Sequence, residues 1–325
     1  MTMKAITQER YGGAGVLGMT EQPRPVPGDG EVLVRVRAAG VDVGVVHLMK
    51  GEPYLIRPML GLRAPRNKVR GSDLAGVVEA VGAGVSGFRA GDAVFGVCDA
   101  AFAEYAVARQ DKLAAKPGEV GFEEAAAIPS SGVTALQAVR GRVTPGQKVL
   151  VIGAGGGVGS FAVQLAKDLG AEVTGVCGAD KAELVRSLGA GHVIDYTRQD
   201  VTAGSLRYDL IVDAAGNRPL SRLRRVLAPR GHLVIVGGEG GGRWLSGLQR
   251  QLRAALLNLV TGQTLQALFA VTRAEDLREL ASLAAAGRVR PVVSRTYPLE
   301  EAARAVGEVA GGHGRGKIVV TIGTA

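Results

Sequence analysis

The sequence predicts an α/β protein of two domains, one rich in β-strands and discontinuous in sequence, the other a doubly wound parallel sheet. The chain has 325 residues, more than one ordinary hydrophobic core accommodates. Short strand-like stretches dominate residues 1–121, whereas strands and helices alternate through 122–270. Strand-like sequence returns within 271–325, so we expect this last segment to complete the first domain.

The β-rich domain is predicted from residue alternation and turn signals. Residues 31–37 alternate in the manner of a half-buried strand. Further short strands are expected at 77–81, 93–97 and 102–107, where glycine-rich turns separate them. The apolar run 317–322 is expected to return to this domain as a strand.

The second domain is predicted from a repeat of strand and helix. Strands are expected at 149–152, 172–176, 192–194, 208–212 and 233–236. Helices are expected between them, one of which begins with Asp180 as its N-cap. Such a repeat implies a parallel sheet that binds ligands beyond the carboxyl ends of its strands. The role of residues 239–263 stays open between a mobile lobe on the substrate side and a subunit contact.

The most informative motif lies between residues 149 and 169. An apolar strand is followed by a glycine-rich turn and then by a helix with apolar residues at three- or four-residue steps. The turn reads A-x-G-x-x-G, the spacing of a Rossmann dinucleotide fingerprint. The alternative is a chance cluster among 49 glycines, which the flanking strand and helix disfavour. We expect the pyrophosphate of a cofactor to contact the turn and the helix start, formed by Ala154, Gly155, Gly156, Gly157, Val158 and Gly159.

Composition excludes several other classes of protein. Cys98 and Cys177 are the only cysteines, too few for a disulfide framework or a four-cysteine zinc site. The net charge is +9, but the basic residues between 218 and 230 have no interleaved aromatic residues and indicate a solvated helix face, not a nucleic-acid site. No apolar run reaches the roughly 20 residues of a membrane span, and the N-terminus has no signal-like segment. We therefore expect a cytoplasmic protein with a small-molecule substrate.

Several stretches resemble the medium-chain dehydrogenase/reductase family, in particular its zinc-independent quinone oxidoreductase-like branch. They are Gly71–Val78, Gly91–Gly96, Phe102–Tyr105, Ser131–Ala135 and Leu188–Tyr196, and the resemblance extends over essentially the whole chain. It implies a GroES-like β-rich catalytic domain, a Rossmann cofactor domain and a homodimer.

The resemblance also bears on metal binding. The first cysteine ligand of the family's zinc enzymes falls at Asp42, the histidine ligand falls at Ser72, and no cysteine stands shortly before Ser130. Catalytic zinc needs three protein ligands and one open position, so we expect no zinc. Without a Lewis acid, a quinone or enone is the easier acceptor, because conjugation moves the incoming negative charge to a distant oxygen.

By resemblance, polar side chains at Asp42, His47 and Tyr54 line the nicotinamide cleft and form the candidate catalytic set. The family's usual asparagine and tyrosine appear here as Asp42 and His47. Packed, purely structural roles for His47 and Tyr54 remain open. The nicotinamide is expected near Thr134, Ala215, Gly216, Asn217, Val236, Gly237 and Gly238.

The end of the second parallel strand bears on cofactor choice. NAD-dependent enzymes usually place an acidic residue there for the ribose hydroxyls, whereas this chain has Cys177. Lys181 and Tyr196 match residues that quinone reductases place near the 2′-phosphate. Asp180 could bind ribose instead unless it caps the helix. The sequence thus favours NADPH over NADH.

These features predict an NADPH-dependent, metal-free oxidoreductase that passes hydride to a conjugated carbonyl. Two alternatives remain: a zinc-free alcohol or aldehyde reductase of the same family, and a cofactor-binding protein without useful turnover. The glycine motif cannot separate them, because all three need it.

Overall fold

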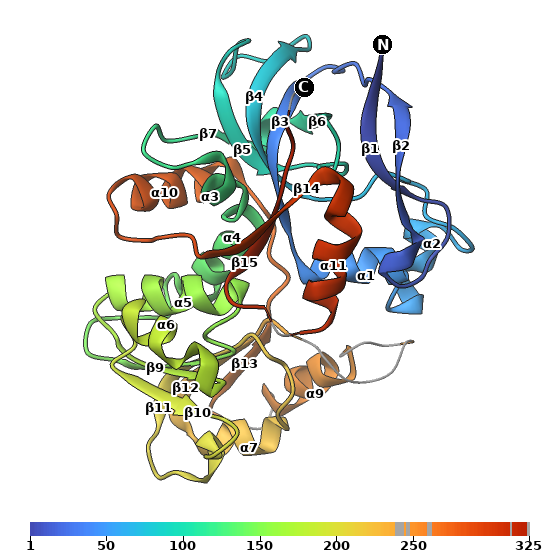
Figure 1. Cartoon of the computed structure of the whole chain (residues 1–325). Coiled ribbons are helices and arrows are strands. Elements are labelled where there is room, and N and C mark those ends of the chain that lie inside the picture. The colour runs from blue at the N-terminus through green and yellow to red at the C-terminus, as the bar shows by residue number, and fades with distance from the viewer. Residues whose placement is uncertain (238–243, 245–247, 259–261, 313, 324–325) are drawn as a thin grey trace. The chain divides into compact units, whose positions relative to one another are not determined.

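The computed structural model describes residues 1–237, 244, 248–258, 262–312 and 314–323 (Figure 1). The chain divides into two units. The first contains Met1–Val133, Val271–Gly287 and Pro291–Ala325, and the second contains Thr134–Ala270 and Arg288–Arg290. Residues 122–133, which the sequence analysis assigns to the cofactor domain, therefore cluster with the β-rich unit.

The first unit is built on a mainly antiparallel sheet with the strand order β14-β15-β3-β4-β5-β7, in which β6 also pairs with β3. Val32, Val34 and Val36 of β3 lie in its main core, as the alternation predicts. A separate hairpin joins β1 and β2. The strands are β1 (Thr2–Gln8), β2 (Leu17–Pro23), β3 (Glu31–Val41), β4 (Asp73–Val81), β5 (Ala93–Val97), β6 (Tyr105–Arg109), β7 (Leu113–Ala115), β14 (Val293–Pro298) and β15 (Lys317–Thr321).

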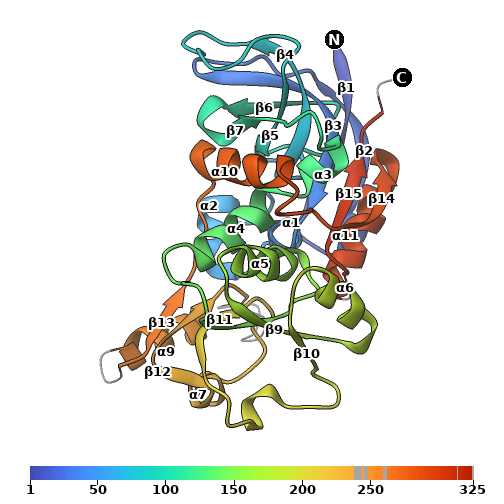
Figure 2. The same cartoon turned by 90° about the vertical axis from the view of Figure 1, so that its left-hand side faces the viewer.

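Short helices pack around this sheet. Figure 2 shows α10 beside β7, with which it is in contact. The helices of this unit are α1 (Val43–Lys50), α2 (Arg57–Leu60), α3 (Phe122–Ala126), α10 (Ala274–Ala285) and α11 (Ala302–Ala310), and α4 (Pro129–Val139) continues into the second unit.

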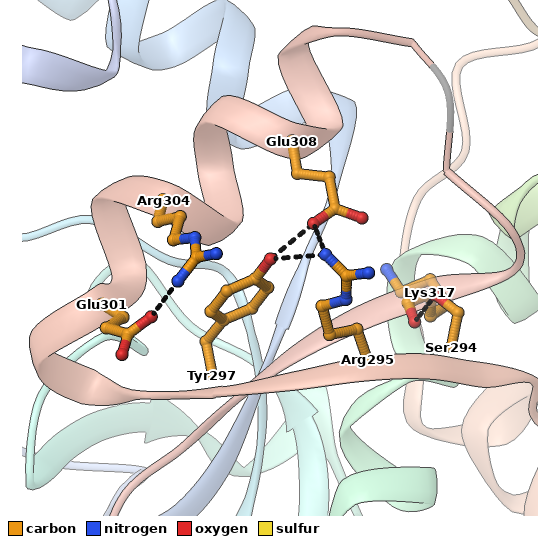
Figure 3. A network of polar contacts seen from close by, with 7 residues as sticks. All are labelled: Ser294, Arg295, Tyr297, Glu301, Arg304, Glu308 and Lys317. Carbon is orange, nitrogen blue, oxygen red and sulfur yellow. Dashed lines mark hydrogen bonds and ion pairs between the residues drawn. The ribbon is translucent and has the colours of Figure 1, made fainter.

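Helix α11 is absent from the sequence prediction, although its small apolar residues at three- and four-residue steps form a buried face. Figure 3 shows the polar contacts that connect α11 with β14. The Tyr297 hydroxyl donates to Glu308 at 2.5 Å, and the Arg295 guanidinium donates to the same carboxylate at 2.9 Å. These contacts attach α11 to the strand that precedes it.

The second unit is a parallel sheet with the order β10-β9-β8-β11-β12-β13. Figure 1 shows α5 and α6 on one side of it and α7 and α9 on the other. The five predicted strands are present as β8 (Lys148–Ile152), β9 (Glu172–Cys177), β10 (His192–Asp195), β11 (Tyr208–Asp213) and β12 (Leu227–Ile235). An edge strand that the sequence did not predict, β13 (Thr264–Ala267), joins them. The helices are α5 (Gly157–Asp168), α6 (Ala182–Ser187), α7 (Leu220–Arg225) and α9 (Leu248–Asn258).

The sequence of the sheet explains its two covered faces. Leu150 and Ile152 of β8 belong to the core beneath α7 and α9, whereas Val149 and Val151, which alternate with them, point to the opposite face. All four are fully or almost fully buried, as a central parallel strand requires. The predicted α/β fold class, with a β-rich domain and a doubly wound parallel sheet, is confirmed.

One predicted helix start is wrong. Asp180 lies in a short 3₁₀ turn, Ala179–Lys181, and α6 begins after it with Lys181 as the N-cap residue. The 3₁₀ turn takes the residues that the sequence analysis assigned to the first helical turn. Within the described ranges, no helix is both long enough and apolar enough to cross a membrane.

Candidate functional site

The glycine-rich turn after β8 is closed by backbone contacts to the neighbouring strands. The amides of Gly153 and Ala154 both donate to the Val176 carbonyl at 3.0 Å, and the Gly156 amide donates to the Gly153 carbonyl at the same distance. Gly156 is the N-cap of α5 and supplies no side chain to cap it. The first amides of a helix have no intrahelical partner, so this helix start offers N–H groups to an anion.

Gly159 has the packing role that the fingerprint predicts. A β-carbon at this position would lie 2.1 Å from the Gly153 carbonyl oxygen. Both groups belong to rigid backbone, so neither can move aside cheaply. The close approach of α5 to the turn therefore requires glycine here.

Two of the predicted phosphate-binding residues lie next to the ends of β9 and β10. A β-carbon at Gly155 would lie 2.8 Å from Lys181 Cδ, which shows that the lysine stem runs along the turn. Tyr196 follows β10; its amide donates to the Cys177 carbonyl at 3.2 Å, and its side chain is exposed. Cys177 ends β9 and is buried, and burial raises the pKa of its thiol, an effect to which Asp180 adds.

The ends of β11 and β12 are organised by Asp213, which is fully buried. Its Oδ1 accepts the Gly216 amide at 3.0 Å, and its carbonyl accepts the amides of Val236 and Gly237 at 3.0 and 3.1 Å. Arg250 of α9 pairs with the Asp213 carboxylate and also donates to the Gly237 carbonyl at 3.3 Å. One aspartate and one arginine thus join the segments predicted to hold the nicotinamide.

In the part of the unit that the structure describes, the cofactor residues predicted from the sequence therefore lie at the carboxyl ends of the parallel strands. Ala154 to Gly159 follow β8, Cys177 ends β9, and Ala215 to Asn217 follow β11. Val236 and Gly237 follow β12, whereas Gly238 lies outside the described residues. Thr134 lies in α4 and is half-buried.

In the first unit, Asp42 lies between β3 and α1, where it is the N-cap residue. Its side chain does not cap the helix. Its Oδ1 lies 2.5 Å from Lys317 Nζ and accepts the Ser131 hydroxyl at 3.0 Å. Burial alone would raise the pKa of Asp42, but the Lys317 charge and these hydrogen bonds bring it below its usual range.

His47 and Tyr54 lie on consecutive local elements after Asp42. His47 is half-buried in the last turn of α1, whose buried face is formed by Val45, Val46 and Met49. Tyr54 is half-buried in the 3₁₀ turn Tyr54–Ile56.

Arg57 links these elements. Its guanidinium lies 4.0 Å from the centre of the Tyr54 ring and 4.7 Å from that of Tyr11. Its Nε donates to the Gly51 carbonyl at 3.0 Å, just beyond α1. Arg57 therefore holds the Tyr54 ring against the end of the helix that carries His47.

The positions that correspond to the zinc ligands of the family's zinc enzymes carry other side chains in this protein. Asp42, at the position of the first ligand, faces a lysine ammonium, and Ser72 offers a hydroxyl where the family's zinc enzymes have histidine. Among the residues that the structure describes, no group of three or more histidine, cysteine or acidic side chains is placed to hold a metal ion. Cys98 is no candidate either, because burial raises the pKa of its thiol to about 12.

Sequence reasoning missed the residues that support these predicted ones. In the sequence, Asp73 and Lys317 stand only within family-like or strand-like stretches, and no motif marks Arg57, Asp213 or Arg250. A weak signal existed for Lys317, which opens a strand whose next three residues are apolar; a lysine that is buried at such a position needs a charged partner.

Comparisons with known proteins identify the family of the chain. Residues 28–138 match the alcohol dehydrogenase GroES-like domain, and residues 188–320 match the zinc-binding dehydrogenase domain. The chloroplast envelope quinone oxidoreductase homolog of Arabidopsis thaliana is 34% identical over 98% of both chains, and the quinone oxidoreductase of Sus scrofa is 32% identical over 97% of this chain and 95% of that one.

Solved structures give the same result. The Escherichia coli quinone oxidoreductase complexed with NADPH aligns with a TM-score of 0.83 and 27% identity, covering 98% of this chain and 99% of that one. A structure described as an NAD-dependent alcohol dehydrogenase aligns with a TM-score of 0.84 and 30% identity, covering 99% and 100%. The chain therefore belongs to the medium-chain dehydrogenase/reductase family and is similar over its whole length to that family's quinone oxidoreductases.

Proposed function

We propose that this protein passes hydride from NADPH to the conjugated carbon of a quinone or an enone without the help of a metal ion. Its family makes the protein an NAD(P)H-dependent oxidoreductase. The observation that carries the finer proposal is the Lys317–Asp42 ion pair, which stands at the sequence position of the first zinc ligand. A carboxylate paired with an ammonium group is poorly disposed to bind zinc as well.

The choice of acceptor follows from the charge that develops during the reaction. Hydride addition to a simple ketone puts negative charge on the oxygen next to the reacting carbon, where a Lewis acid helps most. In a quinone or enone the charge moves through the conjugated system to a more distant oxygen. Hydrogen bonds and a proton donor are then sufficient to stabilise it.

The proposed catalytic set remains Asp42, His47 and Tyr54. His47 and Tyr54 are the candidates to deliver the proton to the reduced product, because both carry N–H or O–H groups and are half-buried on neighbouring elements. Asp42 is proposed to line the same site.

NADPH is proposed over NADH because of Lys181, and ribose binding by Asp180 is the alternative, since Asp180 does not cap α6. The lysine stem lies along Gly155 of the phosphate-binding turn, so its ammonium group can neutralise a 2′-phosphate nearby. When bound, NADPH supplies the hydride. Ala154, Gly155, Gly156, Gly157, Val158 and Gly159 would hold the pyrophosphate, and Cys177 and Tyr196 would flank the adenine ribose.

Two alternatives are kept. The likeness to an alcohol dehydrogenase structure supports a zinc-free alcohol or aldehyde reductase. A protein that binds NADPH without useful turnover would need the same turn. That the protein forms a homodimer and lies in the cytoplasm are also still predictions from the sequence.

The test uses NADPH deuterated at the hydride-donating position and an enone substrate. The enone can accept the hydride either at its β-carbon or at its carbonyl carbon. We expect deuterium at the β-carbon of a saturated ketone, read by mass spectrometry and NMR. Deuterium at the carbonyl carbon of an allylic alcohol would replace the proposal with simple carbonyl reduction. Tight NADPH binding with no deuterated product would favour the non-catalytic alternative.

A further inference from the structure

Three ionisable side chains meet in the first unit, where the ends of β3, β4 and β15 lie side by side; Asp73 and Lys317 are buried, and the Asp42 side chain is 16% exposed. Strand register places Ile318 opposite Val41 and Gly40 opposite Asp73, so Lys317, Asp42 and Asp73 become neighbours. Lys317 Nζ lies 2.5 Å from Asp42 Oδ1 and 3.6 Å from Asp73 Oδ2. Asp73 is fully buried, and Lys317 is only 2% exposed.

The backbone around these groups is well held. The Lys317 amide donates to the Val292 carbonyl at 2.7 Å. The Lys317 carbonyl accepts the Ser294 hydroxyl at 3.1 Å (Figure 3). The lysine therefore enters the cluster from a paired strand, not from a loop. Its side chain has little freedom to reach another partner.

Two serines at the start of α4 complete the cluster. The Ser130 hydroxyl donates to Asp73 Oδ1, and the Ser130 amide donates to Oδ2 at 3.2 Å. Ser131 donates to Asp42 Oδ1 at 3.0 Å, whereas Asp42 Oδ2 is buried and has no hydrogen-bond partner among the described residues. An acid proton on Asp73 would supply a donor that the Asp42 carboxylate lacks.

The charges do not balance if both carboxyl groups are ionised. A fully buried Asp73 carboxylate beside the mostly buried Asp42 carboxylate, with one ammonium group between them, would leave a net negative charge largely away from water, which is costly. Burial, followed by the negative charge of Asp42, raises the pKa of Asp73 well above its usual range, while Lys317 counters the effect of burial on Asp42. The Cys98 thiol, which also senses Asp73, stays neutral because burial raises its pKa to about 12.

We propose that Asp42, Asp73 and Lys317 form a unit that holds one carboxyl proton, on Asp73, and keeps Asp42 as a carboxylate paired with Lys317. We call these three residues the buried triad. Lys317 and Asp73 are then positioning residues. They fix Asp42, which precedes α1, and thereby the start of the helix that carries His47.

The triad also limits where the reaction's proton comes from. A carboxylate held ionised by a buried lysine cannot donate a proton to the product at neutral pH, so His47, Tyr54 or water must do so. This consequence rests on the proposed function, whereas the charge state of the triad does not. An experiment that reads protonation without turnover therefore separates the two.

Infrared spectroscopy of the whole protein at neutral pH provides that reading. We expect one protonated-carboxyl carbonyl band that shifts in D₂O and disappears in Asp73→Asn, a variant in which the amide imitates the neutral acid and should keep the fold. Asp29→Asn, which changes an exposed carboxylate, should leave the band in place. Absence of such a band in the native protein, or its survival in Asp73→Asn, would overturn the proposal.

A second variant tests whether the proton is shared across the triad. In Asp42→Asn, Lys317 faces a single carboxyl group, so Asp73 should ionise and the band should disappear although Asp73 is intact. Survival of the band in this variant would show that Asp73 is protonated independently of the Asp42 charge, which contradicts a shared unit. Lys317→Met should retain the band, because removing the ammonium leaves no cation to stabilise an ionised Asp73; its loss there would contradict the proposed charge distribution.

Discussion

Lys181 is the side chain on which the cofactor preference most depends. Its stem lies along the phosphate-binding turn at Gly155. Lys181→Met should raise the Kd for NADPH about tenfold, or about 1.4 kcal/mol, and leave the Kd for NADH nearly unchanged, because only NADPH carries the 2′-phosphate. Quenching or enhancement of nicotinamide fluorescence in a titration measures both constants.

The matched control is Lys167→Met, which removes an exposed lysine from the last turn of α5, far along the helix from its start at Gly157. It should change neither constant by more than about twofold. Equal weakening of NADPH and NADH by Lys181→Met would assign the lysine a role in the turn and not in phosphate recognition.

The role of a single residue could be predicted where a sequence motif implies one physical requirement. Gly159 could be singled out because helix and strand can approach closely only at glycine, and the structure shows that approach. Asp180 was misassigned, because an aspartate suits both a helix N-cap and a 3₁₀ turn. Asp73 and Lys317 were missed as partners since they are 244 positions apart in the chain, and only strand register brings them together.

At the scale of elements, the packing of α5 on its turn can be tested by one methyl group. Gly159→Ala places a β-carbon 2.1 Å from the Gly153 carbonyl oxygen. We expect a loss of about 1–3 kcal/mol in the free energy of unfolding and weaker NADPH binding, because the helix start must move away from the turn. Urea unfolding and an NADPH titration measure the two effects.

Gly204→Ala is the control within the same unit, because its β-carbon would meet nothing nearer than the Val201 carbonyl oxygen at 4.0 Å. It should be nearly neutral in both assays. Similar losses in the two variants would mean that the effect of Gly159→Ala is a general backbone effect, not close packing.

Helix α9 is joined to the ends of β11 and β12 through Arg250. Its side chain is 14% exposed, and Asp213 is fully buried. Arg250→Met should cost about 3 kcal/mol of stability, because it leaves a buried carboxylate without its cation, and should raise the Kd for NADPH. Arg253→Met, on an exposed site of the same helix, should be neutral.

A double variant checks the cause. Arg250→Met combined with Asp213→Asn should recover part of the lost stability, since the unpaired charge is gone. Additive losses in the double variant would contradict an interaction between the two side chains.

Elements with strong periodicity were predictable, and weakly patterned ones were not. The strand β8 and the helix α5 follow directly from an apolar run and three- to four-residue spacing. The edge strand β13 has the four residues Thr264–Ala267 and alternates too briefly to be recognised. Helix α11 lies in a segment read as β because of the strands on either side of it.

At the scale of the whole molecule, the buried triad should shape the pH dependence of stability. An unfolded aspartate titrates near pH 3.9, whereas burial and the charge of Asp42 raise the pKa of Asp73 in the folded protein. Between the two values the folded state binds more protons, so the contribution of Asp73 to stability falls as pH rises above about 4. The fall ends once Asp73 ionises in the folded protein too.

Asp73→Asn removes this dependence, so its stability relative to the native protein should improve as pH rises above about 4. Urea unfolding midpoints across mildly acidic to neutral pH measure the difference, with Asp29→Asn as the exposed control. A difference that is constant with pH would mean that Asp73 has an ordinary pKa in the folded protein.

The order of the domains could be predicted, because the pattern of the sequence changes along the chain from short strands to strand–helix repeats and back to strands. Their exact boundaries could not. The residues around 122–133 were harder to assign. Helix α3 packs against β3 and β4, and Ser130 and Ser131 at the start of α4 donate hydrogen bonds to the buried triad. No local sequence pattern predicts these contacts.

The central claim is NADPH-dependent, metal-independent reduction of a conjugated carbonyl. The most direct measurement follows the absorbance of the reduced nicotinamide with NADPH or NADH, against quinones, enones and simple aldehydes, with and without a metal chelator. We expect rapid NADPH consumption with a quinone or an enone, slower consumption with NADH, and no effect of the chelator. Activity confined to alcohols or simple aldehydes, or activity abolished by the chelator and restored by zinc, would contradict the account.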